Sequence, residues 1–300
     1  VDDFAHTSRP AMRSPRALAI GLVLLAIAFM SAMDAAAKTA NAALPVLFVV
    51  FMRYVNGFIS AAVIARAIGT PWPSRQAIGR ALLRSVFMLA TVTLFFFSLK
   101  LLPLAQAVAL TFTSPFFLVF GAALILGERI SSRAVVATLI GFSGILVMLS
   151  GRLTGSDHGA PLGYITALAS SVTYAISTNK TRRDTARDPV PTMILAQNLA
   201  LMVFSVPLGI YAFTPLSLNQ LLLLGALGTL GTLGQYLFAH AYALAGANVL
   251  APLEFSAFLW AVAIGILVFG EQPTLATLAG TVLIVAGCLT VIRASRGSTS

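Results

Sequence analysis

The sequence is poor in charge, cysteine and histidine. Only 9% of its 300 residues are charged and 58% are hydrophobic, whereas soluble globular proteins carry roughly a quarter charged residues. A soluble core cannot bury so many apolar side chains, so the composition excludes an ordinary soluble domain. The single cysteine, Cys288, excludes an intrachain disulfide, and the three histidines form no cluster with it. We therefore expect no structural metal site and no cofactor.

A nucleotide-binding loop is also missing from the sequence. No segment has the pattern G-x-x-x-x-G-K-[S/T], so ATP-driven pumping by this chain is not expected. The net charge of +10 would suggest a nucleic-acid partner in a soluble protein. Here the basic residues stand between apolar runs, where they orient membrane helices, and we expect no nucleic acid as partner.

Long apolar runs are what the sequence does contain. Their length of about twenty residues matches the roughly 30 Å hydrocarbon core of a bilayer, which a helix crosses at about 1.5 Å per residue. We predict an all-α integral membrane protein. Ten transmembrane helices are expected at residues 16–35, 45–66, 77–99, 104–126, 132–150, 161–179, 190–212, 217–240, 247–269 and 274–293. Prolines inside or beside these helices are candidates for breaking them, namely Pro103, Pro115, Pro207 and Pro252.

The basic residues predict the orientation of these helices. If the tail 1–15 is cytoplasmic, all but four of the 19 lysines and arginines lie on the cytoplasmic side. The exceptions are Lys38, Lys100, Arg152 and, within the second helix, Arg53. The positive-inside rule therefore predicts a bacterial-type inner-membrane protein with both termini cytoplasmic, including the tail 294–300.

An internal repeat organises the ten helices. Gly127-Glu128 and Gly270-Glu271 are separated by 143 residues, and the same offset aligns Phe112 with Phe255. An offset of 142 aligns Lys38-Thr39 with Lys180-Thr181. The unit has five helices, and because five is odd the second copy must run inverted through the membrane. We predict two inverted halves at 16–150 and 161–293, which keeps the signal-peptide-like first segment as a helix.

With these features the chain resembles the EamA-type ten-helix members of the drug/metabolite transporter superfamily. The resemblance covers 10–295 and is carried by the two Gly-Glu pairs and by the stretches Leu101–Ala105 and Leu244–Asn248. It implies export of small metabolites such as amino acids by alternating access. It also implies a central cavity lined by the first, third, fourth, sixth, eighth and ninth helices. Aromatic amino-acid exporters of the YddG type are the leading comparison, and multidrug or other metabolite efflux is the alternative.

Ionisable residues within a bilayer are expensive, so each one is a functional candidate. Asp34 and Lys38 lie one helical turn apart and are expected to pair, unless Asp34 serves proton coupling. Arg53, about two turns inside the second helix, either snorkels to the headgroups or meets a substrate carboxylate. His240 either exchanges protons or is simply solvated near the interface.

Glu254 differs from its counterpart in the first half, the neutral Thr111. Desolvation in an apolar helix favours the uncharged carboxyl, so Glu254 is a candidate to carry a proton or to contact a substrate amine. The alternative is a hydrogen bond between helices. Protons are accordingly an expected partner beside the small-molecule substrate and the bilayer, and the coupling candidates are Glu254, His240 and Asp34.

Neutral polar residues are expected mostly to join helices. The exceptions are those near the two breaks, 111–115 and 252–256, where freed backbone groups suit a carboxylate or an ammonium. An apolar cavity with a few hydroxyl and amide groups suits small amphipathic or zwitterionic molecules. The candidate cavity residues are Thr111, Ser114, Tyr174, Gln235, Tyr236, Glu254, Ser256 and Trp260, whereas Gly127, Glu128, Gly270 and Glu271 are expected to be structural.

Two rival functions have some support in the sequence. Gly141-Phe142-Ser143-Gly144 matches the G-x-S-G pattern of intramembrane serine proteases, with His240 as the nominal base. Ser143 and His240 lie on helices far apart in the chain, so we do not expect an enzyme. A receptor or assembly factor that moves no solute is the other rival, and a flux assay distinguishes it.

Overall fold

The computed structural model describes residues 15–126, 132–153, 160–181, 189–245 and 247–296, and all regular structure within these ranges is helical. The helices are α1 (Pro15–Ala43), α2 (Val46–Ala67), α3 (Arg75–Leu101), α4 (Leu104–Thr111), α5 (Ser114–Leu126), α6 (Ser132–Leu153), α7 (Pro161–Thr181), α8 (Val190–Tyr211), α9 (Leu218–Leu244), α10 (Ala247–Glu254), α11 (Ser256–Phe269) and α12 (Leu275–Arg296).

Two of the expected helices are interrupted. The segment 104–126 consists of α4 and α5, and the segment 247–269 consists of α10 and α11. Pro115 and Pro252 lie near these interruptions, so the structure confirms breaks at both places. Pro207, by contrast, lies inside an uninterrupted α8. Helix α1 continues to Ala43 instead of ending near residue 35, because its last turns carry polar side chains that bind α3.

Length and hydropathy support a membrane protein. Among the residues that the structure describes, six helical stretches are long and apolar enough to cross a bilayer: 16–43, 46–67, 84–101, 190–211, 218–244 and 249–269. Shorter apolar helices cover 104–118, 135–151 and 275–290. Large apolar side chains on the outside of the bundle, such as Ile210, Leu267 and Leu275, are more than 70% exposed, as expected of side chains that face lipid.

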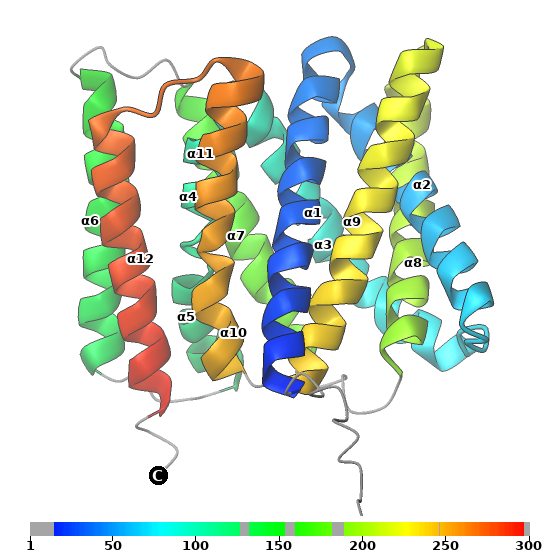
Figure 1. Cartoon of the computed structure of the whole chain (residues 1–300), viewed down its shortest axis with the longest axis horizontal. Coiled ribbons are helices and arrows are strands. Elements are labelled where there is room, and N and C mark those ends of the chain that lie inside the picture. The colour runs from blue at the N-terminus through cyan, green and yellow to red at the C-terminus, as the bar shows by residue number, and fades with distance from the viewer. Residues whose placement is uncertain (1–14, 127–131, 154–159, 182–188, 246, 297–300) are drawn as a thin grey trace, which may run out of the picture.

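The helices form one bundle in which neighbours come from opposite ends of the chain (Figure 1). The most extensive contacts join α6 with α12, α1 with α9, α3 with α7 and α2 with α8. In Figure 1 the pair α6 and α12 lies at one edge, α2 and α8 lie at the other, and α1 begins on the same side on which α12 ends. The largest buried cluster includes Val50 and Tyr54 of α2, Phe96 of α3 and Leu110 of α4.

Glycines allow the close approach of these helices. A Cβ atom on Gly144 of α6 would lie 2.5 Å from the carbonyl oxygen of Gly280 on α12. A Cβ atom on Gly228 of α9 would lie 2.8 Å from the backbone nitrogen of Gly57 on α2. Since lipid tails are as apolar as the side chains, such close backbone packing is a main source of helix association in a membrane.

Candidate functional site

The two helix breaks lie against each other inside the bundle. The rings of Phe112, which follows α4, and Phe255, which separates α10 from α11, lie 5.1 Å apart with an angle of 83° between their planes. Carbonyl groups freed at the first break find side-chain donors. The Cys288 thiol donates to the Phe112 carbonyl at 2.7 Å, and the Thr113 hydroxyl donates to the Leu110 carbonyl at 2.7 Å. At the second break the Ser256 hydroxyl is buried and has no hydrogen-bond partner among the described residues.

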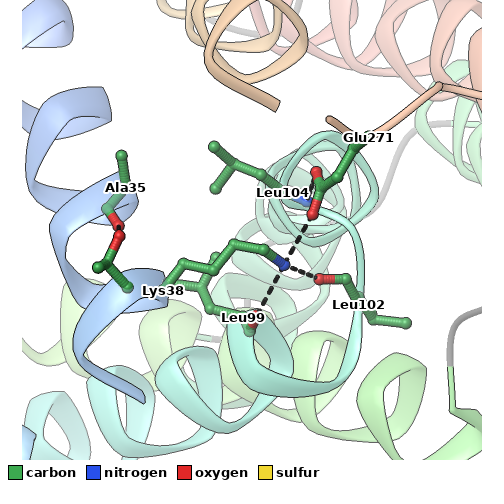
Figure 2. Close-up of polar contacts among 7 residues, drawn as sticks. Ala35, Lys38, Leu99, Leu102, Leu104 and Glu271 are labelled. Carbon is green, nitrogen blue, oxygen red and sulfur yellow. Dashed lines mark hydrogen bonds and ion pairs between the residues drawn. The ribbon is translucent and has the colours of Figure 1, made fainter. Parts of the chain in front are cut away.

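An ion pair joins α1 to the residue that follows the end of α11 (Figure 2). The Lys38 ammonium, near the end of α1, lies 3.0 Å from Glu271 Oε1. It also donates to the carbonyls of Leu99 at 3.1 Å and Leu102 at 2.5 Å. Glu271 Oε2 accepts from the Leu104 backbone N–H at 2.7 Å, which caps the start of α4. This cluster therefore ties α1, the α3–α4 connection and the end of α11 together.

The expected pairing of Asp34 with Lys38 is therefore wrong, because Glu271 takes the lysine. Glu271 follows the end of α11, and Gly270 ends this helix in the left-handed conformation with φ +64°. Gly127 and Glu128, the matching pair of the first half, lie outside the described residues. A cavity of about 30 Å³ lies beside Glu271, lined in part by Gln106 and Thr277. This volume suits a water molecule or two and is far too small for a metabolite.

Asp34 and Arg53 form a second charged region, deeper in the bundle. Arg53 on α2 is only 5% exposed, so it does not snorkel to the headgroups. Its guanidinium stacks over the Tyr54 ring at 4.7 Å, and within the described ranges its Nε has no hydrogen-bond partner. Asp34 Oδ1 is likewise buried and has no partner in the described part of the chain, and Arg53 is close enough to act on Asp34 electrostatically. Two opposite charges are thus held near each other with free polar atoms.

Glu254 lies in a third polar cluster at the end of α10. The Tyr242 hydroxyl of α9 donates to Glu254 Oε1, and Tyr174 of α7 lies within electrostatic range of both. The hydrogen bond anticipated as the alternative for Glu254 is therefore present. It does not exclude a proton-carrying role, because a carboxyl bonded to a tyrosine hydroxyl can still bind a proton.

The other predicted residues lie apart from this cluster. The Thr111 hydroxyl bonds back to the Val108 carbonyl at 2.7 Å within α4, and Ser114 is half-buried at the start of α5. Gln235 accepts from Asn198 at 3.4 Å, and the Tyr236 hydroxyl reaches the Pro191 carbonyl at 3.5 Å, so both join α9 to α8. His240 and Trp260 are exposed, on α9 and α11. The eight cavity candidates therefore do not converge on one place in this conformation.

Comparison with known proteins identifies the family. The model of the EamA-like transporter family matches residues 17–150 and 161–293. The chain belongs to the EamA-like transporter family. It is therefore a membrane transport protein of the drug/metabolite transporter superfamily and not an enzyme.

Relatives of this EamA-like transporter are named for several metabolites. The chain is 28% identical to the pseudopaline exporter CntI of Pseudomonas aeruginosa, covering 92% of this chain and 96% of that protein. It is 30% identical to a riboflavin transporter of Rhizobium johnstonii, with 92% and 90% covered, and 25% identical to an S-adenosylmethionine uptake transporter of Rickettsia bellii, with 94% and 96% covered. One solved crystal structure, 23% identical, shares the fold with a TM-score of 0.64 over 94% of this chain and 99% of the other.

The geometry of this EamA-like transporter also argues against the protease alternative. The Ser143 hydroxyl donates to the Ile140 carbonyl at 2.7 Å within α6, and His240 Nδ1 bonds to the Tyr236 carbonyl at 2.8 Å within α9. Helices α6 and α9 lie in different parts of the bundle in Figure 1. Catalysis requires the two side chains within hydrogen-bond reach of each other.

Sequence reasoning missed several polar contacts of the site. Tyr242 of α9 donates to Glu254 of α10, and no periodic pattern in the sequence predicts contact between these two residues. Gln106 is fully engaged, since its amide accepts from the Tyr164 hydroxyl at 3.2 Å and donates to Thr277 at 3.1 Å. The glycines of α9 were the available sequence signal that Arg53 stays inside the bundle, because Gly231 leaves room for its guanidinium.

Proposed function

We propose that this protein is a secondary transporter of a bacterial-type inner membrane that exports small metabolites, in the first instance aromatic or other neutral amino acids. It works by alternating access between two inverted five-helix halves, 16–150 and 161–293, with both termini on the cytoplasmic side. Ten membrane crossings result when α4 with α5, and α10 with α11, each make one crossing.

The contacts between helices support two related halves. With an offset of 142 to 143 residues, α1 corresponds to α7, α2 to α8, α3 to α9 and α6 to α12. Exchanging each helix for its counterpart turns the contact of α1 with α9 into that of α7 with α3, and the contact of α2 with α9 into that of α8 with α3. All four contacts are present. The same exchange leaves the pair α2 with α8 unchanged, because each helix is the counterpart of the other, and the same holds for α6 with α12. Such pairs are expected beside a two-fold axis.

The observation that carries the proposal is the contact of Phe112 with Phe255. These residues are counterparts at the offset of 143, each marks the break of its own half, and their rings touch. In transporters built from inverted repeats, broken helices meet near the midplane and form the substrate site, around which one half rocks against the other. The meeting point of the breaks is therefore where we place the substrate pathway.

The cargo must be argued from side chains, since the relatives are named for three different metabolites. The described interior of the bundle holds a buried hydroxyl at the second break (Ser256), a buried guanidinium on α2 (Arg53) and two carboxyls, Asp34 on α1 and Glu254 at the end of α10. This combination suits a small molecule with an apolar body and a few polar groups, as an amino acid has. Efflux of apolar drugs is the alternative for the same fold.

Flux across a membrane tests the proposal. Purified protein in liposomes is expected to accelerate efflux of preloaded neutral amino acids, with aromatic ones among them, over protein-free liposomes. Flux of apolar drugs without amino acids would favour the multidrug alternative. Absence of flux across a broad panel of metabolites and drugs would remove the transporter function and favour a receptor or assembly factor.

Glu254 is expected to link this transport to protons. Glu254→Gln keeps an oxygen that accepts from Tyr242 but can no longer bind and release a proton, so a pH gradient is expected to lose its stimulation of export while basal exchange continues. Tyr242→Phe is the complementary control: it removes the hydrogen bond that Glu254→Gln keeps, leaves the carboxyl in place and should keep the response to the pH gradient. The measurement is export at several imposed gradients, and an unchanged pH response of Glu254→Gln would exclude this residue as the coupling group.

A further inference from the structure

The charged residues of α1 have different roles in the structure. Lys38 is fully engaged by Glu271 and by two backbone carbonyls. Asp34 lies one turn deeper in α1. Its spacing predicts an ion pair with Lys38, but Lys38 pairs with Glu271 instead. The Oδ1 atom of Asp34 is buried, and no described residue gives it a hydrogen bond. A buried carboxylate oxygen without a donor is strongly destabilised unless something charged or polar completes it.

Arg53 on α2 offers the complementary feature. The residue is 95% buried, and its Nε–H has no acceptor among the residues that the structure describes. The aromatic face of Tyr54 covers one side of the guanidinium. Gly231 of α9 makes room for it, because a Cβ atom there would lie 3.1 Å from Arg53 Nη2 and 2.6 Å from Met33 Sδ. The guanidinium is thus held by packing and keeps hydrogen-bonding capacity unused.

The two groups are near each other without neutralising each other. Arg53 acts on Asp34 electrostatically, yet the two described side chains form no ion pair. Ionisable residues within membrane helices usually face the bundle interior, and they mark substrate or ion pathways. Arg53 Nε–H and Asp34 Oδ1, which find no hydrogen-bond partner among the described residues, can both be completed by one molecule that carries both opposite charges, since such a molecule desolvates as a neutral whole.

We propose that Asp34 and Arg53 together recognise a zwitterion, with the Asp34 carboxylate accepting from a substrate ammonium and the Arg53 guanidinium donating to a substrate carboxylate. The guanidinium fork matches a carboxylate, which makes arginine the suitable residue for that half of the site. This inference rests on the proposed transport function. It narrows the substrate class to molecules with a free amino group and a free carboxylate close together, as in neutral α-amino acids.

The first experiment uses unmodified protein. Liposomes are loaded with L-phenylalanine, and counterflow of labelled L-phenylalanine is measured with no pH gradient. Two competitors are compared with the amino acid itself: 2-phenylethylamine, which lacks the carboxylate, and 3-phenylpropionate, which lacks the ammonium. Each is expected to compete about 10- to 100-fold more weakly, the factor that corresponds to one lost hydrogen bond to a charged group. If L-phenylalanine is not carried, the same comparison is made with the neutral amino acid that the flux panel identifies.

Variants then assign each charge to its partner. Arg53→Gln is expected to raise the KM for the amino acid about 10- to 100-fold and to abolish discrimination against the amine. Asp34→Asn is expected to abolish discrimination against the acid. The double variant, Arg53→Gln with Asp34→Asn, removes both charges at once. It leaves no unpaired buried charge that could destabilise the fold. Lys100→Gln, an exposed cation at the end of α3, is the control and should behave as the unmodified protein.

The outcomes distinguish failure of the zwitterion site from failure of the transport function. If the unmodified protein carries amino acids but the amine or the acid competes equally well, the zwitterion site is wrong while the transport function stands. Retained discrimination in folded Arg53→Gln and Asp34→Asn variants would overturn it as well. If the unmodified protein carries no amino acid, the site fails together with the amino-acid function.

Discussion

Replacing Glu271 by glutamine is expected to lower the free energy of unfolding by on the order of 3 kcal/mol, because it leaves a mostly buried lysine without its counter-ion. The side chains of Lys38 and Glu271 are only 15% and 17% exposed, so water cannot replace the lost charge fully. The glutamine can still accept from the Leu104 N–H, so the loss reports the ion pair and not the helix cap. The measurement is the thermal unfolding of purified protein in detergent.

A second substitution separates charge from packing. Lys38→Met combined with Glu271→Gln removes both charges and should recover most of the lost stability, since a buried ion pair can be replaced by neutral groups with little net change. Lys100→Gln, which removes an exposed lysine near the same end of α3, should change stability by less than about 0.5 kcal/mol. Unfolding of Glu271→Gln at the temperature of the unmodified protein would contradict the structural role given to this pair.

Gly144→Ala is the second substitution with a large expected effect. The added Cβ would lie 2.5 Å from the Gly280 carbonyl oxygen and 2.9 Å from Ile284 Cγ1, so α6 and α12 must move apart. Overpacking of this kind typically costs about 1–3 kcal/mol, and the backbone atom involved places the expected loss at the upper end. Gly21→Ala is the matched control, because a Cβ there meets nothing within 4 Å.

Detergent-solubilised Gly144→Ala is expected to unfold at a clearly lower temperature, whereas Gly21→Ala should unfold at the original temperature or slightly above it, since alanine favours a helix over glycine. Equal unfolding temperatures for the two variants would mean that α6 and α12 do not pack as described.

Hydropathy and proline positions predicted much of this fold. Apolar runs located the helices, and Pro115 and Pro252 marked the two interruptions because proline removes a backbone donor and crowds the preceding turn. Pro207 was not informative, since α8 accommodates it without ending. Helix ends were harder to predict, as the extension of α1 depends on Lys38 and Asn41 binding α3, which is a tertiary contact.

The charged site was only partly predictable, because its partners are remote in sequence. Local spacing suggested Asp34 for Lys38, but the ion pair uses Glu271 from the other end of the chain. Whether Arg53 reached the headgroups or stayed inside depended on the room left by Gly231 of α9. Glu254 was found from its position after Pro252, whereas its partner Tyr242 required the fold to bring α9 and α10 together.

Alternating exposure of the central break is the most direct test of the transport mechanism. Ser256 lies at the break of α10 and α11, and Ser256→Cys introduces a single thiol there in a Cys288→Ser background that keeps the donor to the Phe112 carbonyl. The measurement is labelling by a membrane-impermeant thiol reagent added to one side or the other of oriented vesicles. Two rocking halves predict labelling from both sides, with substrate changing the balance between them. Labelling from one side only under every condition, or from neither side, would contradict the mechanism.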